Sequence, residues 1–145
     1  MSFEITPTTY GEQRPPVTKP APEFLISMGE ERVRKMVADH YELIKQSSIY
    51  NIFPQDEAEF ELAKKHAADF MIQICGGPKY FNMSRGAPQM VGRHQPFHIT
   101  VDTRIVWLTL YAQVIKELPI EEQIQTSFWN YLEVFSKWMV NRPND

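Results

Sequence analysis

The sequence predicts an all-α protein with about four substantial helices, and three observations support this fold class. In four separate segments the apolar residues recur at every third or fourth position, a spacing that places them on one face of a helix. Sustained alternation of apolar and polar residues, which would indicate half-buried strands, is absent from the sequence. Prolines and glycines fall mostly outside the four segments, where they favour turns and extended chain.

The first two helices are expected over residues 30–46 and 60–74. Charged residues separate the apolar positions in both segments, as in amphipathic helices that bury one face. These positions are Val33, Met36, Val37, Tyr41 and Ile44 in the first segment, and Phe60, Ala63, Ala67, Phe70, Met71 and Ile74 in the second. The Gly-Gly-Pro sequence at 76–78 should end the second helix.

The third and fourth helices are expected on either side of Leu118-Pro119. Thr100 is a suitable N-cap for the third helix. The fourth should begin directly at Pro119, because proline is tolerated in a first turn and the acidic Glu121 favours the positive helix end. We expect this helix to continue to residues 141–143. We place Trp138 in its core and leave the environment of Trp129 open.

An N-terminal arm, residues 1–22, precedes the helical domain, residues 23–145. The arm holds five of the eleven prolines: Pro7, Pro15, Pro16, Pro20 and Pro22. Each lacks a backbone N–H and restricts the residue before it, so the arm should be extended. It is either a disordered tail or a strap packed across the helical domain.

Length, charge and cysteine content narrow the function classes. A chain of 145 residues is expected to form one compact domain. Its net charge of −3 argues against nonspecific binding of nucleic acid. The single cysteine, Cys75, excludes an intramolecular disulfide and a cysteine-based zinc site, which fits a reducing cytoplasm. We also expect no secretory signal and no membrane span, because no apolar run approaches about 18 residues.

The chain has four histidines: His40, His66, His94 and His98. From the residues alone, His40 is expected at a surface or boundary, His66 at a solvated edge after two lysines, and His98 in a loop hydrogen bond. His94 and His98 have the i, i+4 spacing of zinc-binding helices, but Pro96 lies between them and no third ligand is evident. We therefore do not expect a zinc site.

Residues 76–99 are too long and too apolar for a simple connection between bundled helices. His94 lies there among Met90, Phe97 and Ile99. A single histidine in an apolar environment can hold haem iron from one side, but a boundary histidine explains the same residues. Both interpretations stay open at this stage.

Three motifs in this region resemble those of the truncated haemoglobins of group II. They are Gly-Gly-Pro at 76–78, Arg-Gly-Ala-Pro at 85–88 and Gly-Arg-His-Gln-Pro-Phe-His-Ile at 92–99. The resemblance extends from about Gly29 to Asn141, so only the N-terminal arm lies outside it. It implies a truncated globin, a two-over-two helical sandwich around haem b, with the N-terminal arm as an extension.

The resemblance also implies a role for individual residues. His94 would be the proximal iron ligand, Tyr41 and Trp107 the distal hydrogen-bond donors, and Phe53 the aromatic that wedges the haem. Ala63 and Ala67 would line the distal pocket. The remaining haem contacts would be His66, Phe70, Met71, Tyr80, Met90, Arg93, Phe97 and Ile99. His66, with Lys64 or Lys65, would approach the haem propionates, as would Arg93; a different register would bring His66 toward the iron instead.

The function that this resemblance implies is reversible binding of O2, and of CO and NO, at haem. A phenol O–H or indole N–H stabilises negative charge on bound O2 by roughly 1.5–3 kcal/mol per hydrogen bond and so slows its release. Oxygen binding or transport and O2/NO redox chemistry, as an NO dioxygenase or a peroxidase-like enzyme served by a reductase, both fit, in a monomer or homodimer. The alternative is a haem-free helical interaction domain whose arm, with Pro16 and Pro20, is a partner-binding peptide.

Overall fold

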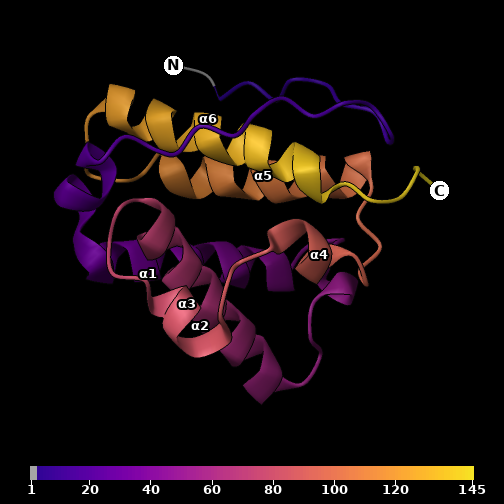
Figure 1. Cartoon of the computed structure of the whole chain (residues 1–145), viewed down its shortest axis with the longest axis horizontal. Coiled ribbons are helices and arrows are strands. Elements are labelled where there is room, and N and C mark those ends of the chain that lie inside the picture. Colours follow the sequence, from indigo (N-terminus) through magenta and orange to yellow (C-terminus); the bar gives the residue numbers. More distant parts are fainter. Residues whose placement is uncertain (1–2) are drawn as a thin grey trace.

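The computed structural model describes residues 3–145 and contains only helices as regular elements within that range (Figure 1). The α-helices are α1 (Glu23–Lys45), α2 (Glu57–Ile74), α3 (Tyr80–Arg85), α4 (Met90–His94), α5 (Val101–Ile115) and α6 (Glu122–Met139), and η1 (Tyr50–Ile52) is a short 3-10 turn. The predicted all-α class is confirmed. None of the helices in residues 3–145 is long and apolar enough to cross a lipid bilayer.

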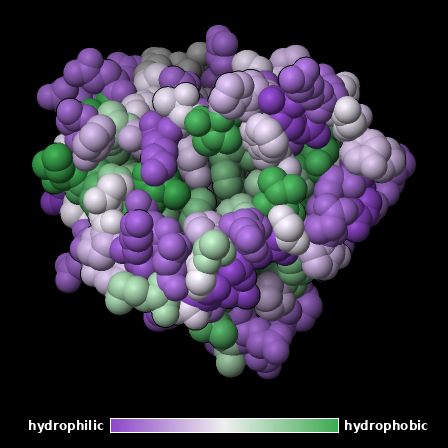
Figure 2. Space-filling model, viewed as in Figure 1, coloured by the Kyte–Doolittle hydropathy of each residue, from purple (hydrophilic) through white to green (hydrophobic). Residues whose placement is uncertain are grey.

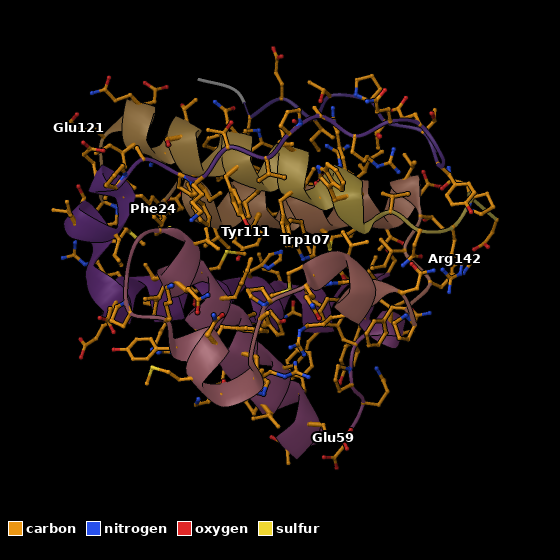
Figure 3. The ribbon with its side chains drawn as sticks, in the orientation of Figure 1. Phe24, Glu59, Trp107, Tyr111, Glu121 and Arg142 are labelled. Atoms are coloured by element: carbon orange, nitrogen blue, oxygen red, sulfur yellow. The ribbon has the colours of Figure 1, made fainter. Side chains whose placement is uncertain are left out.

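Two pairs of helices form two layers, with α1 on α2 and α5 on α6 (Figure 1). Apolar side chains of all four helices pack between the layers. Phe24 of α1 stacks on Phe128 of α6 with ring centroids 4.3 Å apart, and Trp107 and Tyr111 of α5 lie between the layers (Figure 3). This is the expected two-over-two sandwich. The short helices α3 and α4 lie at its open side.

The first helix begins earlier than the apolar spacing predicts, because α1 is two helical pieces joined at Gly29. Gly29 has φ +75°, a conformation that residues with a Cβ rarely adopt. The added first piece buries Phe24 and Met28, four residues apart. The glycine interrupts the periodicity, and for that reason the sequence pattern starts only at residue 30.

Two of the predicted helix boundaries follow local sequence signals. Thr100 caps α5 as predicted, its hydroxyl accepting a hydrogen bond from the backbone N–H of Thr103 at 3.1 Å. At the end of α2, a Cβ on Gly77 would lie 2.6 Å from a methyl carbon of Ile72, so the turn requires glycine. The fourth helix starts at Glu122 rather than at Pro119, because residues 116–120 form turns and bends and Glu121 is extended.

The N-terminal arm runs along α6 in extended form (Figure 1). Trp129 donates its indole N–H to the carbonyl of Glu4 at 2.9 Å, and Trp138 donates to the carbonyl of Pro15 at 2.8 Å. Trp129 is buried by this contact, whereas Trp138, expected in the core, is 37% exposed. Of the two alternatives for the arm, the contacts are those of a strap.

The arm also completes a buried polar network around Arg104. The guanidinium of Arg104 donates to the Ser136 hydroxyl at 2.9 Å, the Thr6 carbonyl at 2.9 Å, and the carboxylate of Glu133 at 3.0 Å. The same carboxylate accepts hydrogen bonds from the backbone N–H and the hydroxyl of Thr6. One arm residue therefore binds both members of a buried ion pair.

Candidate functional site

A cavity of about 430 Å³ lies between the two layers, within the usual range for sites that hold small molecules. It opens on the face shown in Figure 2, where apolar side chains gather around a hollow. Most of its walls are aromatic, aliphatic or thioether side chains. They include Phe53, Phe70, Met71, Phe81, Met90, Phe97, Ile99, Phe135 and Met139.

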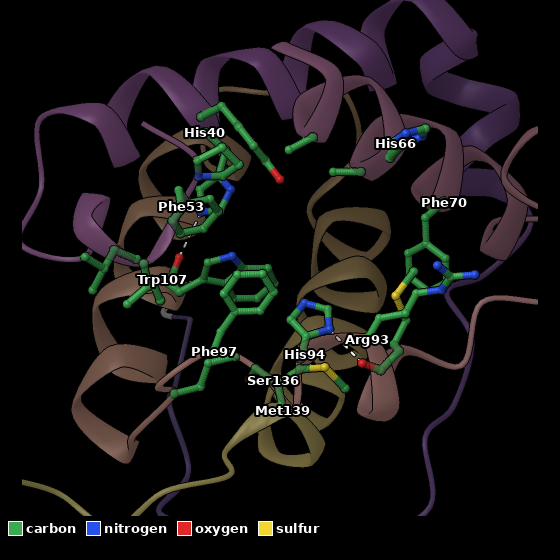
Figure 4. Close-up of a pocket in the computed structure, with 18 of the residues that line it drawn as sticks. His40, Phe53, His66, Phe70, Arg93, His94, Phe97, Trp107, Ser136 and Met139 are labelled. Carbon is green, nitrogen blue, oxygen red and sulfur yellow. Dashed lines mark hydrogen bonds between the residues drawn. The ribbon is translucent and has the colours of Figure 1, made fainter. Parts of the chain in front are cut away.

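His94, at the end of α4, faces this cavity (Figure 4). Its Nδ1 lies 2.7 Å from the carbonyl oxygen of Met90. A carbonyl can only accept, so Nδ1 carries the proton and Nε2 keeps its lone pair. Burial lowers the pKa of His94, which favours the neutral ring. No group within residues 3–145 hydrogen-bonds to Nε2, so this nitrogen is available to a metal.

Tyr41 of α1 and Trp107 of α5 also line the cavity. The Tyr41 ring packs edge-on against Phe53 and Phe60, with centroids 5.7 and 5.3 Å apart. Burial raises the pKa of Tyr41, so the phenol keeps its proton. Neither the phenol O–H nor the indole N–H has a hydrogen-bond partner among the described residues. Two donors on half-buried residues of different helices are therefore available to a ligand in the cavity.

The α2 wall combines small residues with a histidine. Ala63, Ala67 and His66 all line the cavity. Nδ1 of His66 is buried and has no hydrogen-bond partner within residues 3–145, although we expected this ring at a solvated edge. Burial and then the charges of Arg85, Lys65 and Arg93 lower the pKa of His66, against an opposing contribution from Asp69.

The basic residues expected near His66 divide into two groups. Lys64 and Lys65 pair with Glu61 and Asp69 at 2.5 and 3.2 Å and do not line the cavity. Arg93 does line it, and its guanidinium donates to three loop carbonyls, those of Arg85, Ala87 and Pro88, at 2.5–3.0 Å. Arg93 therefore braces the loop before His94 as well as adding positive charge to the cavity wall.

Tyr80 is the predicted cofactor contact that the structure does not bring to the cavity. As the first residue of α3 it turns toward α1, where its hydroxyl donates to Glu30 at 2.9 Å and the guanidinium of Arg34 lies over its ring. The expected haem contact of Tyr80 therefore gains no support from the cavity lining. The structure does bring together the other predicted positions: Tyr41, Phe53, Ala63, His66, Ala67, Phe70, Met71, Met90, Arg93, His94, Phe97, Ile99 and Trp107.

His40 is the cavity residue that sequence reasoning placed wrongly. It is 1% exposed rather than at a surface, and its ring stacks on Tyr111 with centroids 3.6 Å apart. Its Nε2 lies 3.1 Å from the backbone carbonyl of Trp107. The signal was present, because His40 is seven residues after Val33 and four before Ile44, on the buried stripe of α1. A stripe defined by apolar residues alone does not include this histidine.

The remaining histidine, His98, lies outside the cavity and hydrogen-bonds to Asp145 at 3.0 Å. Within residues 3–145 no three His, Cys, Asp or Glu side chains form a cluster that could hold a metal ion.

Comparison with known proteins assigns this architecture to a family. The family model of the bacterial-like globins matches residues 27–141. Group 2 truncated hemoglobin YjbI of Bacillus subtilis is 29% identical over 117 residues, which are 80% of this chain and 86% of that protein.

Solved structures agree. Phosphate-bound Hell's gate globin IV superposes with a TM-score of 0.87 at 32% identity, covering 98% of this chain and 89% of that one. The truncated oxygen-avid haemoglobin of Bacillus subtilis has a TM-score of 0.76 at 28% identity, covering 83% and 99%. The chain belongs to the bacterial-like globin family, as a haem-binding globin of the group II truncated haemoglobin type.

Proposed function

We propose that this globin holds haem b through Nε2 of His94 and binds O2, and other diatomic gases such as CO and NO, on the side of Tyr41 and Trp107. The observation that carries the proposal is the fixed tautomer of His94. Its Nδ1–H is committed to the Met90 carbonyl, and its Nε2 lone pair faces an apolar cavity without a partner. When one ring nitrogen of a histidine donates a hydrogen bond to a carbonyl, that bond orients the ring and raises the basicity of the other nitrogen, which binds the metal.

The cavity fits a porphyrin in its chemistry. Its apolar wall offers aromatic and thioether surfaces, such as Phe70, Met71 and Phe53, to the faces and edge of a flat ring. The same wall keeps water from the iron. His66 and Arg93, with Arg85 beside them, supply a basic edge for the two propionates.

Haem, when bound, supplies an iron at which a diatomic gas binds and takes on partial negative charge. In this proposal the phenol O–H of Tyr41 and the indole N–H of Trp107 donate to that gas. Both donors are free to do so, because neither has another partner among the described residues. Two donors slow release of O2, which suits redox chemistry with NO or peroxide, supported by an electron donor, better than rapid delivery. The Bacillus subtilis relative is described as oxygen-avid, which supports slow release of O2 in this protein as well.

The test is the visible spectrum of the protein during titration with hemin, then after dithionite, then under CO. We expect an intense Soret band that saturates at one hemin per chain and shifts on reduction and on CO binding. His94→Ala should lose this band or replace it with that of loosely bound hemin.

His98→Ala is the matched control, since His98 lies four residues away and outside the cavity, and it should behave as wild type. A wild-type spectrum equal to that of free hemin would contradict the proposal. It would favour the alternative, a haem-free interaction domain. In that alternative the arm would have to leave α6, to which it is hydrogen-bonded, before it could bind a partner protein.

A further inference from the structure

His40 joins the two helices that carry the gas-facing donors. Its side chain projects from α1, one residue before Tyr41, and its Nε2 lies 3.1 Å from the backbone carbonyl of Trp107 on α5 (Figure 4). The carbonyl can only accept, so Nε2 carries the proton and donates. This hydrogen bond fixes the backbone of Trp107 relative to the helix of Tyr41.

Ring contacts hold the imidazole in place on the α5 side. The ring stacks on Tyr111 at 3.6 Å with an interplanar angle of 24°, and it meets the Trp107 indole edge-on at 5.3 Å and 85°. Trp107 and Tyr111 are four residues apart and therefore neighbours on one face of α5. His40 thus touches both the backbone and the ring of Trp107, and the imidazole cannot shift without moving the indole.

Packing alone does not account for a histidine at this position. A phenylalanine would provide the same stacked ring, whereas the imidazole buries an Nδ1 that has no hydrogen-bond partner within residues 3–145. Burial lowers the pKa of His40 to about 3, so the ring stays neutral and keeps a single N–H near neutral pH. The specific contribution of the imidazole is therefore the hydrogen bond from Nε2 to Trp107.

We propose that His40 is a positioning residue that sets the spacing between the Tyr41 hydroxyl and the Trp107 indole. Two donors on separate helices act on one small ligand only if their relative position is held to a fraction of an ångström. The consequence for gas binding rests on the proposed function. We call the hydrogen bond and ring contacts of His40 with Trp107 and Tyr111 the clamp. The clamp does not depend on haem, so it is tested first in the protein without haem.

The first test compares His40→Phe with His40→Gln in the 15N-labelled apoprotein. Phe keeps the ring and loses the donor, whereas the Gln amide nitrogen reaches the position of Nε2 and keeps it. The readout is the indole N–H signal of Trp107, assigned by its absence in Trp107→Phe. We expect one signal at matching positions in wild type and His40→Gln, and a displaced or doubled signal in His40→Phe. An unchanged signal in His40→Phe would overturn the clamp.

The second test uses the haem-loaded protein. O2 should dissociate about tenfold faster from His40→Phe, as expected when one hydrogen bond is weakened, and within about twofold of wild type from His40→Gln. In a Tyr41→Phe/Trp107→Phe background, His40→Phe should add nothing. An equal acceleration in that background would show that His40 does not act through the two donors.

Failure of a variant to fold, or of the protein to bind hemin, can be told apart from failure of the clamp. If His40→Phe does not fold, His40→Asn replaces it, because the shorter amide reaches only the position of Nδ1 and should behave as Phe does. If the protein takes up no hemin, the proposed function fails while the indole signal still decides the clamp.

Discussion

The buried polar groups of this globin are treated differently on the side of the N-terminal arm and on the side of the cavity. Around Arg104 and Glu133, hydrogen bonds from Thr6 and to Ser136 satisfy the charged groups. Burial raises the pKa of Glu133, but hydrogen bonds from Thr6 and the charges of Lys137 and Arg104 outweigh it, so the pKa lies below its usual value.

On the cavity side, by contrast, several polar atoms lack partners among residues 3–145, although Arg104 and Ser136 of the arm-side network also line the cavity. Nδ1 of His40 and Nδ1 of His66 are buried and unsatisfied. The Tyr41 hydroxyl, the Trp107 indole and Nε2 of His94, on half-buried residues, have no partner within the same range. Buried polar groups are normally hydrogen-bonded, so the two buried exceptions require an explanation. The difference indicates that the arm side is built for stability and the cavity side for a ligand.

The largest expected effect that tests this comparison is on stability. Glu133→Met should lower the free energy of unfolding by about 3–5 kcal/mol, because it leaves the Arg104 guanidinium buried without its carboxylate partner. Urea unfolding of the apoprotein measures this. Lys35→Met is the control: its ion pair with Asp39 is exposed and should change stability by less than about 1 kcal/mol. Equal effects of the two variants would contradict the comparison.

The next effect is on ligand release, without a matching effect on stability. Tyr41→Phe and Trp107→Phe should each speed O2 dissociation from the haem-loaded protein by roughly 10- to 100-fold, the value of one hydrogen bond to a charged group. Rapid mixing with an O2 scavenger or with CO measures the rate. Fast release that neither substitution changes would count against donors on this side and against the redox role.

A smaller effect concerns the pH dependence of unfolding. His40 has a pKa of about 3 in the folded protein and about 6.5 when unfolded. Between these values the unfolded chain binds one more proton, so stability falls by about 1.4 kcal/mol per pH unit as the pH drops below about 6. His40→Phe should remove that share of the slope, measured by urea unfolding from pH 7 to 4. Parallel slopes in the two proteins would mean that His40 is not buried as a neutral ring.

The smallest expected effect lies at the end of the arm. Trp138→Phe removes the hydrogen bond to the Pro15 carbonyl at a partly exposed site, and should cost about 1 kcal/mol of unfolding free energy. Hemin affinity should stay as in wild type. A loss of hemin binding in this variant would show that the arm and the cavity are not separable.

The sequence predicts the helices well where caps and breaks are local. Thr100, the Gly-Gly-Pro turn and the apolar stripes place α2 and α5 closely. The kink at Gly29 cannot be predicted from the apolar spacing, because a positive φ inside a helix leaves no periodic signal. The contact between the arm and α6 also depends on residues more than 100 positions apart, which local patterns do not report.

The same limit applies to the site. His94 is identified by a motif, and its apolar neighbours are close in sequence. The environment of His40 depends on α5, 67 residues away, and the outward turn of Tyr80 depends on Glu30 and Arg34 in α1. Residue type alone therefore misplaces both, although the position of His40 on the stripe of α1 would have indicated its burial.

The most direct test of the central claim is thermal unfolding of wild type, His94→Ala and Glu133→Met, each with and without hemin. Glu133 belongs to the arm-side network and, unlike Arg104, does not line the cavity. Hemin at about 100 times its Kd should raise the wild-type Tm by roughly 8 °C. We predict the same shift in Glu133→Met, from a lower starting Tm, and little or no shift in His94→Ala. A full hemin shift in His94→Ala, or its loss in Glu133→Met, would contradict the division between a paired arm side for stability and an unpaired cavity side for haem.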